Sequence, residues 1–194
     1  MSYKTLTDWN FSDRVFSKDN TIKVLNLFYK DKKTLEIIKA TSTEDMHNNI
    51  DYYVNGDAVQ WRVQRLENIK GNINDYGPTL RYSRESSLHE DRKESELKKI
   101  MNNKKKGLPY PKHHIWCIVD KKYDIIKLFI IDIDIFEDDF QKNKYELWDT
   151  KKGKKLNAST SGKKISLKEN TDFSSEFIIL REKYLLPNTV IFKY

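Results

Sequence analysis

An aspartate, a glutamine and an arginine have the types and spacing to form a site for a metal ion or a phosphate. Asn55-Gly56 is a strong β-hairpin signal and lies between two runs of strand-forming residues. A type I′ turn centred on this dipeptide makes Asp51 face Gln60 across the hairpin, with Arg62 two residues further along the same face. Carboxylate and carboxamide oxygens bind divalent cations, and a guanidinium binds phosphate oxygens. We therefore expect metal or phosphate chemistry on this face.

The same turn fixes which hairpin residues meet. Its register pairs the residues nearest the turn: Val54 with Asp57, Tyr53 with Ala58, and Tyr52 with Val59. Side chains alternate across a strand, and the polar face of the second strand holds Gln60, Arg62 and Gln64. The apolar face, which we expect to pack against the core, holds Val59, Trp61 and Val63. The polar set is also compatible with an ordinary solvated hairpin face on which an Asp and an Arg pair weakly.

Hydrophobic patterning places this hairpin within an alternation of helices and strands. Apolar residues at three-and-four spacing predict a helix over residues 19–32, whereas residues 34–41 fit either a continued helix or a short strand. The rest of the chain predicts a strand over 78–85, a surface helix over 87–103, a strand pair over 114–120 and 124–134, a short acidic helix over 136–148, a Lys/Gly/Ser loop over 150–164, and late strands over 175–181 and 189–193. This order predicts one α/β (α+β) domain over residues 1–194, with a mixed central sheet flanked by helices.

This element order, with an Asp on the first hairpin strand and a polar-x-basic pair on the second, resembles the PD-(D/E)xK nuclease superfamily. The resemblance covers about residues 18–134 and implies a restriction-endonuclease-like core, followed by a basic C-terminal elaboration over about 135–194. It implies that Asp51 is the metal-binding Asp, that Gln60 takes the second acidic position, and that Arg62 replaces the Lys that contacts the scissile phosphate or the attacking water. It also implies Mg²⁺, or Mn²⁺, as the cofactor.

Two of these residues differ from the usual motif. Gln60 offers a carbonyl oxygen without a negative charge, so the expected metal affinity is weaker than with Glu. Arg62 can clamp a phosphate but does not deprotonate, so it cannot act as a general base. A further carboxylate from the first helix region would be Glu36 or Glu44, which the sequence does not distinguish. We take Glu36, with Asp51 and Gln60, as the candidate metal ligands, and rank Glu67 lower because it lies on the face opposite Gln60.

The composition favours a polyanionic partner. The chain has 36 Lys and Arg against 29 Asp and Glu, a formal charge of +7, and nucleic acid is the first candidate, DNA ahead of RNA. Basic candidates for phosphate contacts follow the hairpin and fill the lysine-rich region: Arg65, Arg81, Arg84, Lys98, Lys104, Lys105, Lys154, Lys155 and Lys163. Such contacts give affinity without sequence specificity and weaken with salt. Acids interleave with the bases of residues 84–99, so an ordinary salt-bridged helix face is the alternative there.

The cysteine content, the lack of long apolar runs and the absence of common motifs exclude several kinds of site and cellular location. The single cysteine, Cys117, excludes an intrachain disulfide and fits a cytoplasmic protein. No apolar run is long enough to span a bilayer and no signal peptide is recognisable, so we expect no membrane association. His113, His114 and Cys117 do not make a zinc site, because adjacent strand residues point to opposite faces and no second cluster supplies ligands. The sequence contains no Gly-rich phosphate loop, nucleophile elbow or dinucleotide fingerprint.

These features predict a nucleic-acid-binding protein that is a metal-dependent DNA endonuclease of phage or mobile-element type. Cleavage of both strands with one site per chain ordinarily calls for two subunits, which suggests a homodimer. The alternative is a catalytically inactive nuclease-fold protein that acts as a nucleic-acid-binding, inhibitor or accessory protein, and Gln60 and Arg62 favour it. A third alternative, an interaction protein without a nucleic-acid role, predicts negligible DNA affinity at moderate salt.

Overall fold

Two mixed β-sheets and the helices around them make up the computed structural model, which describes residues 11–29, 34–69, 72–83, 96–169, 176–185 and 189–193. The predicted α+β class with a mixed sheet is confirmed, because parallel and antiparallel neighbours occur in the same sheet and helices cover it. Among the helices of the described residues, none is both long and apolar enough to cross a membrane.

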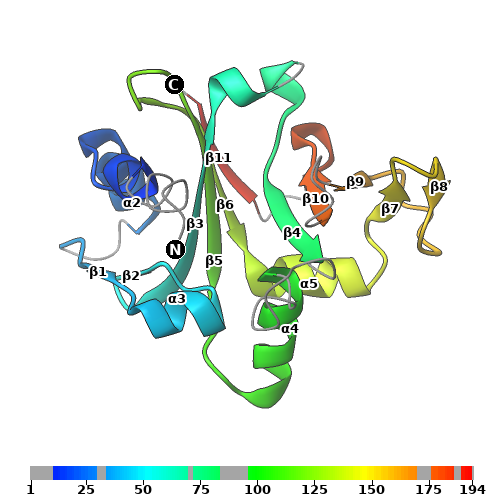
Figure 1. Ribbon diagram of the computed structural model, residues 1–194, viewed down its shortest axis with the longest axis horizontal. Helices are drawn as coiled ribbons and strands as arrows, with labels where there is room; N and C mark the ends of the chain where they lie inside the picture. The colour runs from blue at the N-terminus through cyan, green and yellow to red at the C-terminus, as the bar shows by residue number, and fades with distance from the viewer. Residues whose placement is uncertain are drawn as a thin grey trace.

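The larger sheet carries the predicted hairpin. Its strands, in spatial order, are β1 (Ile37–Lys39), β2 (Tyr52–Val54), β3 (Asp57–Arg65), β5 (His113–Val119), β6 (Ile125–Asp132) and β11 (Thr189–Lys193). Neighbours in this order are antiparallel except β3 and β5, which are parallel. Figure 1 shows β3, β5 and β6 running through the centre of the molecule. A parallel pair needs a crossover connection, and here that connection includes the helix α4 (Glu96–Lys106).

The hairpin has the predicted register. Tyr52 pairs with Val59, Tyr53 with Ala58 and Val54 with Asp57. Asn55 and Gly56 have φ angles of 52° and 84°, which are the positive values that both central residues of a type I′ turn require. The strand pairing ends at Tyr52, so the predicted cross-strand pair of Asp51 and Gln60 is not part of it. Asp51 instead donates its N–H to the Val59 carbonyl at 2.9 Å.

Each face of the larger sheet packs against different elements. Helix α2 (Asp19–Phe28) covers one face, where Val24 and Leu25 join Val59, Trp61 and Ile115 in the largest apolar cluster. On the other side lie α4, α5 (Ile133–Gln141) and the second sheet (Figure 1). Every residue of β5 is buried, as expected for a strand covered on both faces.

The smaller sheet brings together strands that are distant in sequence. Its order is β4 (Thr79–Ser83), β10 (Glu176–Leu180), β9 (Lys164–Glu169), β7 (Glu146–Asp149) and β8 (Lys154–Lys155), with β7 and β9 parallel. The predicted strand at 78–85 therefore exists as β4, and it pairs with β10 rather than with the hairpin. Gly77 permits this pairing, because a Cβ there would lie 2.1 Å from the Leu180 carbonyl oxygen.

Other predicted elements are confirmed with shifted bounds. Residues 34–41, left open by the sequence, contain β1 and lead into α3 (Ser42–Asn48), which starts with a capping box between Thr41 and Glu44. The acidic helix is α5, which starts at an Asp132 cap and ends before β7, so a helix reaching residue 148 was wrong. The short strand β8 lies within the predicted lysine-rich loop. Of the predicted helix at 87–103, the part before Glu96 lies outside the described residues. The described residues also contain the 3-10 turns η1 (Leu66–Asn68), η2 (Ile73–Asp75) and η4 (Glu182–Tyr184).

Candidate active site

Arg62 joins two acidic side chains on the polar face of the larger sheet. Its Nη1 lies 3.3 Å from Asp51 Oδ2, and its Nη2 lies 2.8 Å from Glu96 Oε1. Nη1 also donates to the Trp61 carbonyl at 3.1 Å. Asp51 directly precedes β2, Arg62 is central in β3, and Glu96 is the first residue of α4. We call Asp51, Arg62 and Glu96 the acid-arginine cluster.

The acid-arginine cluster is open to solvent mainly through its arginine. The Arg62 side chain is 36% exposed, against 16% for Asp51 and 9% for Glu96. Asp51 Oδ2 also accepts a hydrogen bond of 2.6 Å from the Trp61 N–H, which fixes the carboxylate against the backbone of β3. The two carboxylates of the cluster are thus less exposed than the arginine that joins them.

Burial dominates the electrostatics of Asp51. Loss of water raises the pKa of its carboxyl group to about 7, although Arg62 and the Trp61 N–H act in the opposite direction. The charges of Asp45 and Glu96 raise it further. Burial acts to lower the pKa of Arg62, but Glu96 and Asp51 raise it overall, so the guanidinium keeps its charge. An extra cation at Asp51 would favour the ionised carboxylate, because the carboxylate is poorly solvated as it stands.

This raised pKa predicts a pH dependence of stability that belongs to Asp51. Between about pH 4 and pH 7 the folded state keeps a proton that the unfolded chain has lost, so stability falls as the pH rises through this window. Asp51→Asn removes the titrating group. Urea unfolding at about pH 5 and about pH 8 should show a smaller loss of unfolding free energy for the variant than for the wild type. Equal losses in the two proteins would contradict the raised pKa.

Gln60 and His114 form a buried polar pair beside the acid-arginine cluster. They are neighbours across the parallel β3/β5 pair, both side chains are fully buried, and His114 Nδ1 lies 2.8 Å from Gln60 Oε1. Gln60 Nε2 and His114 Nε2 have no hydrogen-bond partner. Burial lowers the pKa of His114 to about 4, so the ring is neutral. Glu96 and Arg62 also act on this pKa, in opposite directions, so the ring lies within electrostatic reach of the cluster.

The donor set of this region fits a hard divalent cation. Asp51 and Glu96 supply carboxylate oxygens and Gln60 a carboxamide oxygen, which are the ligands that Mg²⁺ and Mn²⁺ prefer. No three His, Cys, Asp or Glu side chains of the described residues gather closely enough to hold a metal ion, so the carboxamide is needed to complete such a set. Arg62 now supplies the positive charge that both carboxylates require.

The structure brings Glu96, and not the carboxylates favoured by the sequence, to Arg62. Glu36 is exposed at the turn end of the hairpin, where its N–H donates to Asn55 Oδ1. Glu44 caps α3 and accepts a hydrogen bond of 2.6 Å from the Tyr53 hydroxyl. Glu67 lies beyond the end of β3. No sequence signal points to Glu96, because its approach to Arg62 depends on how the crossover between β3 and β5 folds.

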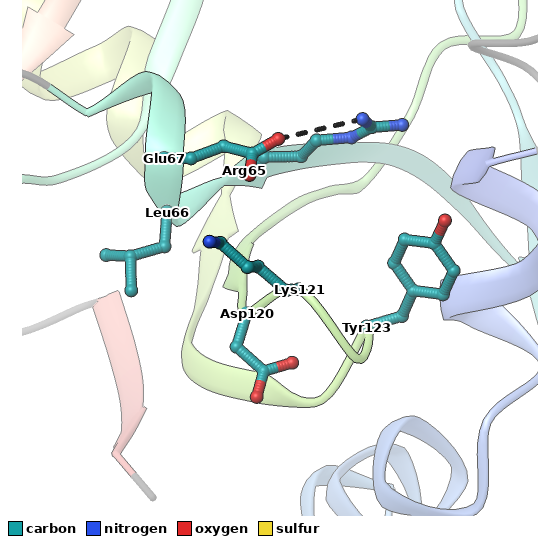
Figure 2. Close-up of a pocket in the computed structure, with 6 residues that line it drawn as sticks. All are labelled: Arg65, Leu66, Glu67, Asp120, Lys121 and Tyr123. Carbon is teal, nitrogen blue, oxygen red and sulfur yellow. Dashed lines mark ion pairs between the residues drawn. The ribbon is translucent and has the colours of Figure 1, made fainter.

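Arg65, a predicted nucleic-acid contact, lies on the opposite side of the sheet from Arg62. Its guanidinium stacks 4.3 Å from the Phe11 ring centre, and its Nη1 lies 3.8 Å from Glu67 Oε1. Figure 2 shows these two side chains at a cavity of about 260 Å³ that is also lined by Leu66, Asp120, Lys121 and Tyr123. Nothing in this geometry connects Arg65 to the acid-arginine cluster.

The other predicted phosphate contacts fall into three groups. Lys98 and Lys105 are exposed on α4, whereas Lys104 on the same helix makes ion pairs of 2.6 Å with Asp134 and 2.7 Å with Glu137. Lys154 and Lys155 form β8 and are exposed, and Lys163 precedes β9 and is half-buried. Arg81 belongs to β4, but its side chain and the whole of Arg84 lie outside the described residues. The exposed lysines among these candidates are therefore those of α4 and β8.

The two adjacent histidines point to opposite faces, as expected from strand alternation. His113 Nδ1 lies 3.0 Å from the Tyr29 hydroxyl on the α2 side, whereas His114 contacts Gln60 on the other side.

No model of a known protein family matches this chain, and no curated protein matches it. The function must therefore be argued from the site.

Proposed function

We propose that this protein is a divalent-metal-dependent nuclease that hydrolyses phosphodiester bonds in DNA. The observation that carries the proposal is Arg62, whose partly exposed side chain holds its guanidinium between the largely buried carboxylates of Asp51 and Glu96. Beside it, Gln60 and His114 each present a buried polar atom without a partner. Buried unpaired polar atoms are rare in folded proteins, and an absent ion or water is one explanation for them.

In this proposal, Asp51, Glu96 and Gln60 hold the metal and Arg62 binds the phosphate. A bound Mg²⁺ would neutralise charge on the phosphoryl oxygens and favour ionisation of the attacking water. Arg62 would leave the carboxylates for the phosphate and stabilise the charge that develops there. Because Arg62 stays protonated throughout, it serves as an electrostatic group and not as the proton acceptor.

The arrangement of elements also supports a restriction-endonuclease-like core. The three antiparallel strands β1, β2 and β3 are followed by α4 and by β5, which lies parallel to β3. The polar pair of Gln60 and Arg62 is on the central strand of this unit, and Asp51 enters its hairpin partner. The order of these elements and the positions of Asp51, Gln60 and Arg62 support the proposed motif assignment.

The proposal is tested by incubating the purified protein with supercoiled, linear and branched DNA while Mg²⁺ or Mn²⁺ is titrated. We expect cleavage that needs the metal and that stops when EDTA is added. DNA binding without cleavage at any metal concentration would refute the nuclease and leave a binding protein. Neither binding nor cleavage at low salt would refute a nucleic-acid role altogether.

A nuclease fold that binds without cutting is the second candidate. The two ion pairs of Arg62 favour it, since the guanidinium already gives both Asp51 and Glu96 a positively charged partner without a metal. In such a protein, metal ions would change neither DNA affinity nor thermal stability. The metal titration therefore separates the two candidates.

Lysines in and beside the smaller sheet should supply much of the DNA affinity, since Lys154 and Lys155 are exposed and Lys163 is half-buried. Lys154→Ser, Lys155→Ser and Lys163→Ser together should weaken DNA binding and lower the slope of log K against log salt by up to about 0.9 for each lysine that contacts phosphate. A matched control replaces three exposed lysines of other surfaces, Lys23, Lys121 and Lys122. Fluorescence anisotropy at several salt concentrations measures the DNA affinity and its salt dependence for the two triple variants. The proposal for these lysines fails if the control variant changes the slope of log K against log salt as much as the variant of Lys154, Lys155 and Lys163 does.

A further inference from the structure

The contact between Gln60 and His114 allows two arrangements of hydrogen atoms. In the first, His114 carries its proton on Nδ1 and donates it to Gln60 Oε1 over 2.8 Å, which leaves both Nε2 atoms buried and unpaired. In the second, the carboxamide is rotated by half a turn, its NH₂ group donates to Nδ1, and the ring proton is on Nε2. A carboxamide has nearly the same shape in both orientations, so the hydrogen-bond network decides between them.

The surroundings of the ring favour the second arrangement. The backbone of Thr79 acts on His114 as a hydrogen-bond acceptor and raises its pKa, and because Nδ1 faces Gln60, we infer that this acceptor lies on the Nε2 side of the ring. A proton on Nε2 would have this acceptor nearby, whereas a lone pair there would have no donor. The rotated carboxamide also pairs the Gln60 nitrogen, so one change removes both buried unpaired nitrogens.

We propose that His114 is a positioning residue whose Nε2–H tautomer holds Gln60 by its NH₂ group and turns the carboxamide oxygen away from the ring, to serve as a metal ligand. This inference rests on the proposed function, since it assigns the partner that orients one of the three metal-binding side chains. Groups behind a metal ligand that fix its orientation commonly change metal affinity ten- to a hundredfold when removed. It also explains how a Gln can stand at a position that usually holds an acid, because an oriented carbonyl dipole replaces part of the missing charge.

The tautomer can be measured directly on the metal-free protein. Histidine labelled with ¹⁵N gives distinct shifts for protonated and unprotonated ring nitrogens, and the spectrum of His114→Asn assigns the signals of His114. We expect an unprotonated Nδ1 and a protonated Nε2. The opposite pattern would overturn the inference while leaving the proposed function standing.

Mn²⁺ affinity, followed by the loss of the free-ion EPR signal, tests the consequence. His114→Ala should weaken Mn²⁺ binding ten- to a hundredfold. His114→Asn should restore it to within a few-fold of the wild type, because the Asn side-chain oxygen can accept from the Gln60 NH₂ group. Gln60→Ala should weaken binding as much as His114→Ala, and the double variant should lose no more than either single one.

His113→Ala is the matched control, since His113 is the next residue but faces α2 and Tyr29. It should lower the urea midpoint without changing Mn²⁺ affinity. Equal Mn²⁺ affinity of His114→Ala and the wild type would overturn the inference, and so would a His114→Asn variant as weak as His114→Ala. Mn²⁺ binding that follows these expectations in a protein that never cleaves DNA would refute the nuclease and keep the positioning role.

Discussion

Asp51→Asn should reduce metal-dependent DNA cleavage by roughly a thousandfold, because the loss of a charged metal ligand removes several kcal/mol of transition-state stabilisation. The fold should survive, since the Asn side-chain oxygen can still accept the hydrogen bond that the Trp61 N–H gives to Asp51. Initial rates on plasmid DNA at saturating Mg²⁺ measure the effect. Circular dichroism and the urea midpoint verify that the variant is folded.

The matched control for this variant is Asp57→Asn. Asp57 is on the same hairpin, at the other end of the strand pairing, where it pairs with Lys112 at 3.1 Å. It makes no contact with Arg62 in the structure, so cleavage should stay within about twofold of the wild type. Cleavage that survives Asp51→Asn, or that is lost equally in both variants, would show that the acid-arginine cluster is not the active site.

Glu182→Ala should destabilise the protein by about 3 kcal/mol, because it leaves a buried ammonium group without its counter-ion. The Lys127 side chain is only 4% exposed, and its Nζ lies 2.5 Å from Glu182 Oε2 and 2.9 Å from the Ile73 carbonyl oxygen. This contact ties β6 to the 3-10 turns η2 and η4. Urea unfolding at neutral pH, with the midpoint and slope fitted together, measures the loss.

Two further variants show whether the loss of stability in Glu182→Ala comes from the unpaired charge of Lys127. Lys127→Met with Glu182→Leu removes both charges, and this double variant should recover most of the stability. Lys193 also pairs with Glu182, at 2.5 Å, but its side chain is 57% exposed, so Lys193→Ala should cost less than about 1 kcal/mol. A Glu182→Ala variant no less stable than Lys193→Ala would contradict the importance of burial here.

The parts of the fold that sequence predicted correctly depend on local chemistry. Asn55-Gly56 tolerates positive φ at both positions, so it determined the turn type, and the turn determined the register of β2 and β3. The pair β5 and β6 was recognisable because two apolar runs flank a short polar turn, where Asp120 Oδ1 accepts from the Lys122 and Asp124 N–H groups. Such signals lie within a few residues of the structure that they specify.

The parts that sequence did not predict depend on contacts between distant segments. The partner of β4 is β10, and nothing in residues 79–83 indicates which strand they will meet. Glu96 and His114 were not recognised as neighbours of Arg62 and Gln60, because the register between β3 and β5 is set by packing on both faces of a buried strand. Alternation along β3 did predict that Gln60 and Arg62 share a face and that Arg65 does not.

The pairing of β4 with β10 has a consequence for how the chain folds as it leaves the ribosome. Ser83 meets Glu176, so the main-chain groups of β4 stay without their strand partner until most of the polypeptide has been synthesised. The larger sheet likewise gains β11 beside β6 only after that. Nascent chains of this protein would therefore carry two open strand edges for much of their synthesis, and early aggregation or chaperone capture would compete with native assembly at those edges.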